Sequence, residues 1–104
     1  MDIEFLDDDL KLALDELAAR SGLAVPEIVS LVEYGVFEPL GATGEPARWT
    51  FSVRMIKVAR RAARLRRELE LDDPHAVAVA LTLLERIDSL EGEVRELRCH
   101  LLRV

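Results

Sequence analysis

Few residues in this sequence have the types and spacing that catalysis or metal binding requires. His75 and His100 lie far apart in the chain, and neither forms a metal-ligand spacing with Cys99, the single cysteine. The glycine-rich segment GATGEP (residues 41–46) lacks the Lys-Ser or Lys-Thr pair of a phosphate-binding loop and is typical of a hairpin tip. We therefore predict a protein that is not an enzyme and that uses no metal or cofactor.

The chemistry that the sequence does offer is that of charged surfaces. The net charge is −6, but the charges are distributed unevenly along the chain. Residues 53–69 hold seven bases and one acid, whereas residues 1–52 hold 11 acids and three bases, and residues 70–104 hold eight acids and four bases. Phosphate contacts need a basic footprint on the docking face. The pattern disfavours nucleic acid as a partner and favours a protein with a basic surface.

The sequence also indicates where the protein works. No apolar run approaches the roughly 20 residues that cross a bilayer, so we expect no membrane partner. The acidic start MDIEFLDDD is unlike a secretory signal or a transit peptide. A single cysteine excludes an intrachain disulfide, and nothing points to export. We expect a cytoplasmic protein.

Two short helices with a glycine-containing turn are predicted in the first third of the chain. Residues 14–21 place leucines on one helical face, and Gly22 supplies the turn. Residues 26–34 follow, with Pro26 in the first turn, where proline is tolerated, and Gly35 where a helix would stop. This arrangement predicts a helix-turn-helix. The preceding residues are open to two interpretations: MDIEFL alternates like a strand, and the acids after it could begin a helix.

A small wing and two further helices are predicted to follow. Residues 36–38 and 48–51 are β-like, and the loop between them is rich in Gly and Pro, which predicts a hairpin. Ser52 is expected to cap a long helix over residues 53–70, and Asp73-Pro74 to begin the last one.

The last helix carries the most regular pattern in the sequence. Six apolar residues spaced 4, 3, 4, 3, 4 form a heptad seam; they are Leu83, Ile87, Leu90, Val94, Leu97 and Leu101. The charges beside the seam match in both a parallel and an antiparallel pair, so the orientation stays open. The seam could instead pack on the chain's own core, but it is stricter than a small domain needs. We predict a homodimer held by these six residues.

Together these elements predict a mainly α fold. Residues 1–73 form a winged helix-turn-helix domain with a small two-stranded wing and a long third helix. Residues 74–104 form a C-terminal coiled-coil dimerisation helix packed on that domain.

The order of parts resembles a known family. LDELAARSGLAVPEIVSLVEYGVFEP, the wing ending RWTF, a long helix and a terminal coiled coil resemble the winged MerR-type helix-turn-helix. Within that group, residues 60–97, RRAARLRRELELDDPHAVAVALTLLERIDSLEGEVREL, resemble the CbpM chaperone-modulator family. The resemblance covers roughly residues 13–101. It implies a bacterial protein without enzyme activity that binds the J-domain of the DnaJ-like co-chaperone CbpA and restrains its stimulation of DnaK.

The charges agree with that implication. A DNA-reading second helix carries Arg, Lys, Asn or Gln to base edges, whereas residues 26–34 carry two acids and no base. We hypothesise that the reading surface has been converted from nucleic acid to a basic protein. The candidate partner contacts are chosen on charge and on the enrichment of Trp and Arg at interfaces; they are Asp15, Glu16, Glu27, Glu33, Arg48 and Trp49.

Four alternatives remain beside this hypothesis. Trp49 is more economically a packing residue of the wing than a contact residue. The bases of residues 60–67 are more economically paired with the acids of residues 70–96 than used for binding. The whole chain could be a MerR-like transcription regulator in which Arg48 and residues 60–67 meet phosphates, or an inert dimerisation module.

Overall fold

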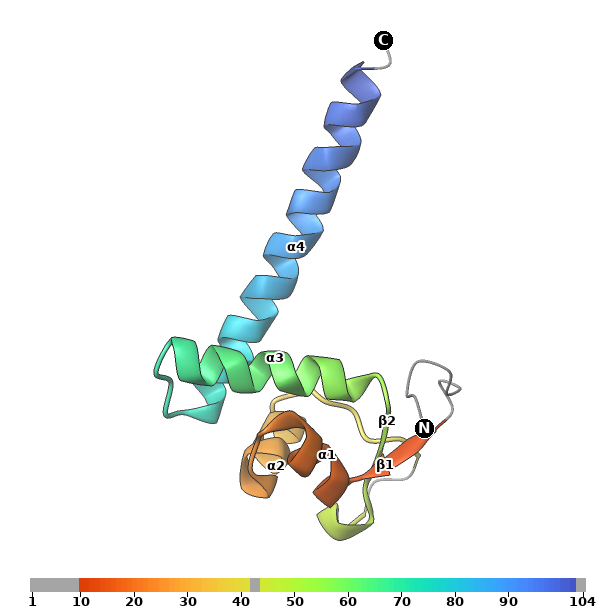
Figure 1. The fold of residues 1–104 in the computed structure, drawn as a ribbon, viewed down its shortest axis with the longest axis vertical. Coiled ribbons are helices and arrows are strands. Elements are labelled where there is room, and N and C mark those ends of the chain that lie inside the picture. Colours follow the sequence, from red (N-terminus) through yellow and green to blue (C-terminus); the bar gives the residue numbers. More distant parts are fainter. Residues whose placement is uncertain (1–9, 42–43, 103–104) are drawn as a thin grey trace.

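The computed structural model describes residues 10–41 and 44–102, and its elements form a helical body with one long projecting helix (Figure 1). The elements in chain order are β1 (Lys11–Ala13), α1 (Leu14–Ser21), α2 (Val25–Glu33), the 3₁₀ turn η2 (Pro46–Arg48), β2 (Thr50–Ser52), α3 (Met55–Glu68) and α4 (Pro74–Leu102). The mainly α class and the small two-stranded antiparallel sheet are confirmed. The molecule measures 55 × 35 × 26 Å, because the second half of α4 extends away from the body.

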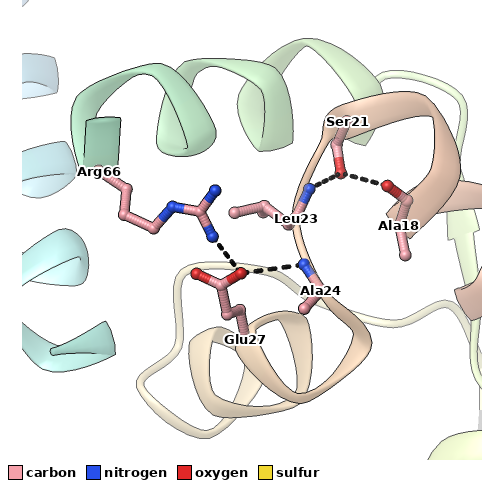
Figure 2. Close-up of polar contacts among 6 residues, drawn as sticks. All are labelled: Ala18, Ser21, Leu23, Ala24, Glu27 and Arg66. Atoms are coloured by element: carbon pink, nitrogen blue, oxygen red, sulfur yellow. Dashed lines mark hydrogen bonds and ion pairs between the residues drawn. The ribbon is translucent and has the colours of Figure 1, made fainter. Parts of the chain in front are cut away.

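The predicted helix-turn-helix is confirmed as α1 and α2. Gly22 ends α1 in the left-handed region, at φ 86°, and its N–H donates to the Ala18 carbonyl at 3.1 Å. The Ser21 hydroxyl also donates to Ala18 and accepts from the Leu23 N–H at 3.2 Å, which fixes the turn (Figure 2). Only glycine adopts such a φ without strain, which is why Gly22 predicts the turn correctly from the sequence.

The predicted pairing of the wing is wrong. The strand β2 pairs with β1 in antiparallel register, with Leu12 opposite Phe51. Residues 36–38 form no strand; Phe37 is buried in the core after the turn at the end of α2, and only Leu40 makes an isolated bridge to Thr50. The proline that follows this segment has no N–H for a ladder, which helps to explain why the predicted strand does not form. The two interpretations of the first residues, as a strand or as the start of a helix, concern residues 1–9, which lie outside the described residues.

The core lies where α1, α2, α3 and the sheet meet. Its largest fully buried side chains come from every part of the body; they are Leu17, Ile28, Leu31, Phe37, Phe51 and Leu81. Burial of each such side chain contributes about 1.5–3 kcal/mol. The core therefore includes the first turns of α4, where Leu81 lies, while the rest of that helix reaches beyond it.

Alanines allow α3 to pack closely against its neighbours. Ala59, Ala62 and Ala63 form one buried face of α3, which contacts both α1 and α4. The helix is slightly shorter than the predicted residues 53–70, and the Ser52 hydroxyl accepts the N–H of Arg54 just before it begins.

The start of α4 agrees with its prediction. The carboxylate of Asp73 accepts the N–H of His75 at 3.0 Å, and Pro74 occupies the first position of the helix. The first turns of α4 belong to the core of the body. The division of the chain into two domains at residue 73 stays a prediction. None of the described helices is both long enough and apolar enough to span a membrane.

One ion pair joins the helix-turn-helix to α3. The carboxylate of Glu27, in the first turn of α2, accepts the backbone N–H of Ala24 at 3.0 Å and pairs with the guanidinium of Arg66 (Figure 2). The contact with Ala24 is one half of a capping box. The other half is missing, because alanine has no side-chain oxygen to accept the backbone N–H of Glu27. The two charged side chains are only 23% and 28% exposed, so water screens this pair less than a surface pair.

We predict that the Glu27–Arg66 pair contributes measurably to folding. Glu27→Ala is expected to lower the free energy of unfolding by about 1–2 kcal/mol, because it removes the ion pair and the cap together. Glu27→Gln should cost less, since the amide oxygen still accepts the Ala24 N–H. Urea unfolding of single and double variants with Arg66→Ala should give a coupling energy of about 1 kcal/mol.

The exposed pair Arg64–Glu68 is the matched control for this double-mutant cycle. Its partners lie one helical turn apart, 3.2 Å between charged atoms, with side chains 70% and 63% exposed. Its coupling energy should be only about 0.3 kcal/mol. Equal coupling in the two cycles would contradict a structural role for Glu27 and Arg66.

Candidate protein-interaction surfaces

Three of the predicted contact residues are exposed acids at helix ends. Asp15 and Glu16 lie in the first turn of α1, and Glu33 is the last residue of α2. Within the part of the chain that the structure describes, none of the three has a side-chain hydrogen bond or an ion pair. Their carboxylates are therefore available to a partner.

Helix dipoles distinguish these acids. Asp15 and Glu16 sit near the positive end of α1, where an acid stabilises its own helix. Glu33 sits near the negative end of α2, where an acid costs about 0.3–1 kcal/mol. Local stability therefore explains the first two acids but not the third.

The structure places Glu27 differently from the other acids. Its carboxylate already accepts from Ala24 and pairs with Arg66, so it links the start of α2 to α3. No local sequence signal identified this pairing, because Arg66 lies 39 positions further along the chain. The position of Glu27 three residues after Ala24 indicates only a cap at the start of α2, and not a partner on α3.

Arg48 and Trp49 are adjacent in sequence but differ in exposure. Arg48 is exposed on η2, which packs against α1 (Figure 1). Trp49 is only 9% exposed and meets Phe51 edge to face, with ring centroids 6.4 Å apart. Its indole Nε1 has no hydrogen-bond partner among the described residues. The packing interpretation of Trp49 is confirmed.

The basic residues of α3 are partly engaged within the chain. Arg61 pairs with Asp88 of α4 at 2.7 Å, which is the pairing with residues 70–96 that the sequence predicts. Arg64 instead pairs within α3, and the Nε of Arg60 donates to the backbone carbonyl of Arg20 at 3.0 Å. The predicted pairing with residues 70–96 therefore holds for only one of these three arginines.

The heptad seam is an exposed apolar stripe on α4. Its six residues, Leu83, Ile87, Leu90, Val94, Leu97 and Leu101, are between 46% and 72% exposed. The alternative in which the seam packs on the chain's own core is therefore wrong. Buried Val77 and Leu81 face the body, and at 100° per residue the stripe occupies the opposite side of the helix. Monomeric proteins rarely leave so continuous an apolar surface in water.

The residues that could hold a metal ion or react as a nucleophile do not form one cluster in the described structure. Within residues 10–41 and 44–102, no group of His, Cys, Asp and Glu side chains is arranged to hold a metal ion. Cys99 is an exposed thiol on the projecting part of α4. His75 stacks on the half-exposed ring of Tyr34, with centroids 5.0 Å apart, a contact that the sequence does not predict. The surfaces suited to function are thus the free acids of α1 and α2, the bases of α3 and the apolar stripe.

Comparisons with known proteins identify the family. The family described as MerR HTH family regulatory protein matches residues 12–99. The chaperone modulatory protein CbpM of Salmonella arizonae is 41% identical over 90 residues, 86% of each chain. The CbpM of Pseudomonas putida is 37% identical over 81% of this chain and 80% of its own, and that of Coxiella burnetii is 37% identical over 83% and 78%. The chain therefore belongs to the CbpM family of chaperone modulatory proteins and is built on a MerR-type helix-turn-helix.

Proposed function

We propose that this protein binds the J-domain of a CbpA-like, DnaJ-type co-chaperone and thereby limits the co-chaperone's stimulation of DnaK. The observation that carries the proposal is the 41% identity to a chaperone modulatory protein across 86% of both chains. The protein acts by occupying a surface of its partner, and no covalent step is required. It works in the cytoplasm, where DnaK and its co-chaperones act.

The free acids define the proposed contact face. Asp15 and Glu16 on α1 and Glu33 on α2 present carboxylates that have no partner among the described residues and that attract lysines and arginines of a basic partner. Arg48 lies on the turn packed against α1 and contributes a directional contact. Glu27 and Trp49 are not among the proposed contacts, since one is paired inside the chain and the other is buried.

The same charges argue against DNA reading. The match to MerR-type regulatory proteins makes a transcription regulator the second candidate. A recognition helix reads base edges with Arg, Lys, Asn or Gln, and α2, with the sequence VPEIVSLVE, has none of these. Its carboxylates would repel phosphates.

Calorimetric titration with the full-length CbpA-like co-chaperone of the same organism tests the proposal. We expect binding that weakens as salt is raised, and no binding to a co-chaperone that lacks its J-domain. Asp15→Lys combined with Glu16→Lys should weaken binding by about tenfold or more, because attraction becomes repulsion.

The matched control changes the same charge elsewhere. Asp72→Lys with Glu96→Lys alters two exposed acids in the α3–α4 loop and on the outer part of α4, and it should leave the affinity within about twofold. Binding that survives the Asp15 and Glu16 changes would move the site to another face. If the protein did not bind the co-chaperone at low salt but bound promoter DNA specifically, the J-domain proposal would be wrong and a transcription regulator would be supported.

We also propose that two copies associate through the apolar stripe. Six exposed apolar residues in heptad spacing need a partner helix to leave water, and a second α4 supplies an identical seam. The flanking charges support this pairing: Arg86 can meet Glu91 or Glu93 of the second copy, depending on orientation. The parallel and antiparallel arrangements satisfy these charges equally.

Light scattering after size exclusion tests the homodimer. The protein should have twice its chain mass of 11.7 kDa, and Leu90→Glu with Val94→Glu should yield monomers, because two carboxylates would enter the seam. Arg95→Glu with Cys99→Glu places the same side chains on the outer side of α4 and should leave the dimer intact. A wild-type mass of one chain would refute the dimer without affecting the proposed J-domain contact.

A further inference from the structure

A basic hollow lies between α3 and α4. It has a volume of about 660 Å³, and five bases of α3 line it; they are Lys57, Arg60, Arg61, Arg64 and Arg67. Only Glu68 and Glu85 add negative charge to the lining. The site therefore carries positive charge on a protein whose net charge is −6, and the proposed J-domain contact does not use it.

Part of that positive charge has no acidic partner among the described residues. Arg61 is neutralised by Asp88 and Arg64 by Glu68, while Arg60 donates only to a neutral carbonyl. Lys57 and Arg67 make no hydrogen bond or ion pair with any residue that the structure describes. Three cations thus remain without a carboxylate partner around one hollow.

The floor of the hollow is apolar. The half-buried Val58 and the methylene stems of the arginines supply its apolar surface, over the buried Leu81. A phosphate backbone is held by charge and gains nothing from such a floor, and no aromatic side chain is present in the lining to stack on a base. An apolar side chain flanked by carboxylates would satisfy both the floor and the rim.

The hollow would stay open in the proposed homodimer. Leu81, Glu85 and Asp88 recur at helical spacing on the side of α4 that faces α3. The apolar stripe lies on the opposite side of the same helix. A second copy bound to the stripe would therefore leave the hollow accessible.

We propose that the hollow between α3 and α4 is a docking site for an acidic segment of a protein partner, a short stretch with an apolar side chain between Asp and Glu residues. Its cations hold the carboxylates, and its floor takes the apolar side chain. The site differs in charge and position from the acidic face of α1 and α2, so the two proposals stand or fall separately.

Fluorescence anisotropy of the full chain with a labelled synthetic peptide tests this site. The probe is Glu-Asp-Asp-Leu-Phe-Glu-Asp-Glu, and the comparison peptide has Ser-Ser in place of Leu-Phe. We expect the first peptide to bind at least about fivefold more tightly than the comparison peptide, because only the first has apolar side chains to place against the apolar lining of the hollow. Lys57→Glu with Arg67→Glu should weaken its binding by about tenfold or more, and this double variant breaks no ion pair of the described chain.

Controls separate the site from general charge effects. Lys11→Glu with Arg95→Glu makes the same change in net charge at exposed positions outside the hollow and should leave binding within about twofold. Unchanged unfolding midpoints would show that the variants fold. Failure of the first peptide to bind, equal binding of the two peptides, or tighter binding of a DNA duplex that the same variant abolishes would each overturn the proposal.

Discussion

Close packing of α3 through its alanine face determines how the helices of the body are arranged. Ala59, Ala62 and Ala63 are small enough to let α3 pack closely with α1 and α4. Because that face is buried, the arginines of the same helix must point outward, where one reaches Glu27 and another reaches Asp88. One choice of residue size thus sets the core, the interhelical ion pairs and the basic hollow.

The local features of the fold could be predicted from the sequence, and the pairings between distant segments could not. Gly22 and Asp73 act through backbone conformation and capping within a few residues, so their patterns were sufficient. The heptad stripe was predictable because periodicity alone defines a helical face. The partner of β2 was not, since β1 lies far away in the chain and three residues carry little signal. The same holds for Glu27 and Arg66, whose charges matched many possible partners.

The candidate surfaces show the same division. Charge counts separated the acidic helix-turn-helix from the basic helix, but they did not reveal which charges are free. The structure separates Asp15, Glu16 and Glu33, which lack internal partners among the described residues, from Glu27, which has one. A MerR-type scaffold without bases on its reading helix is consistent with membership of a family of chaperone modulators. Its surfaces of opposite charge and its apolar stripe suit contacts with proteins rather than with a duplex.

If this protein restrains a J-domain co-chaperone, the ATPase rate of DnaK should report it. The rate would be measured with the CbpA-like co-chaperone of the same organism, while this chain is added up to a molar excess over the co-chaperone. We expect the stimulated rate to fall toward the rate of DnaK alone, and the chain carrying Asp15→Lys and Glu16→Lys to have little effect. Full stimulation in the presence of excess wild-type chain would contradict it.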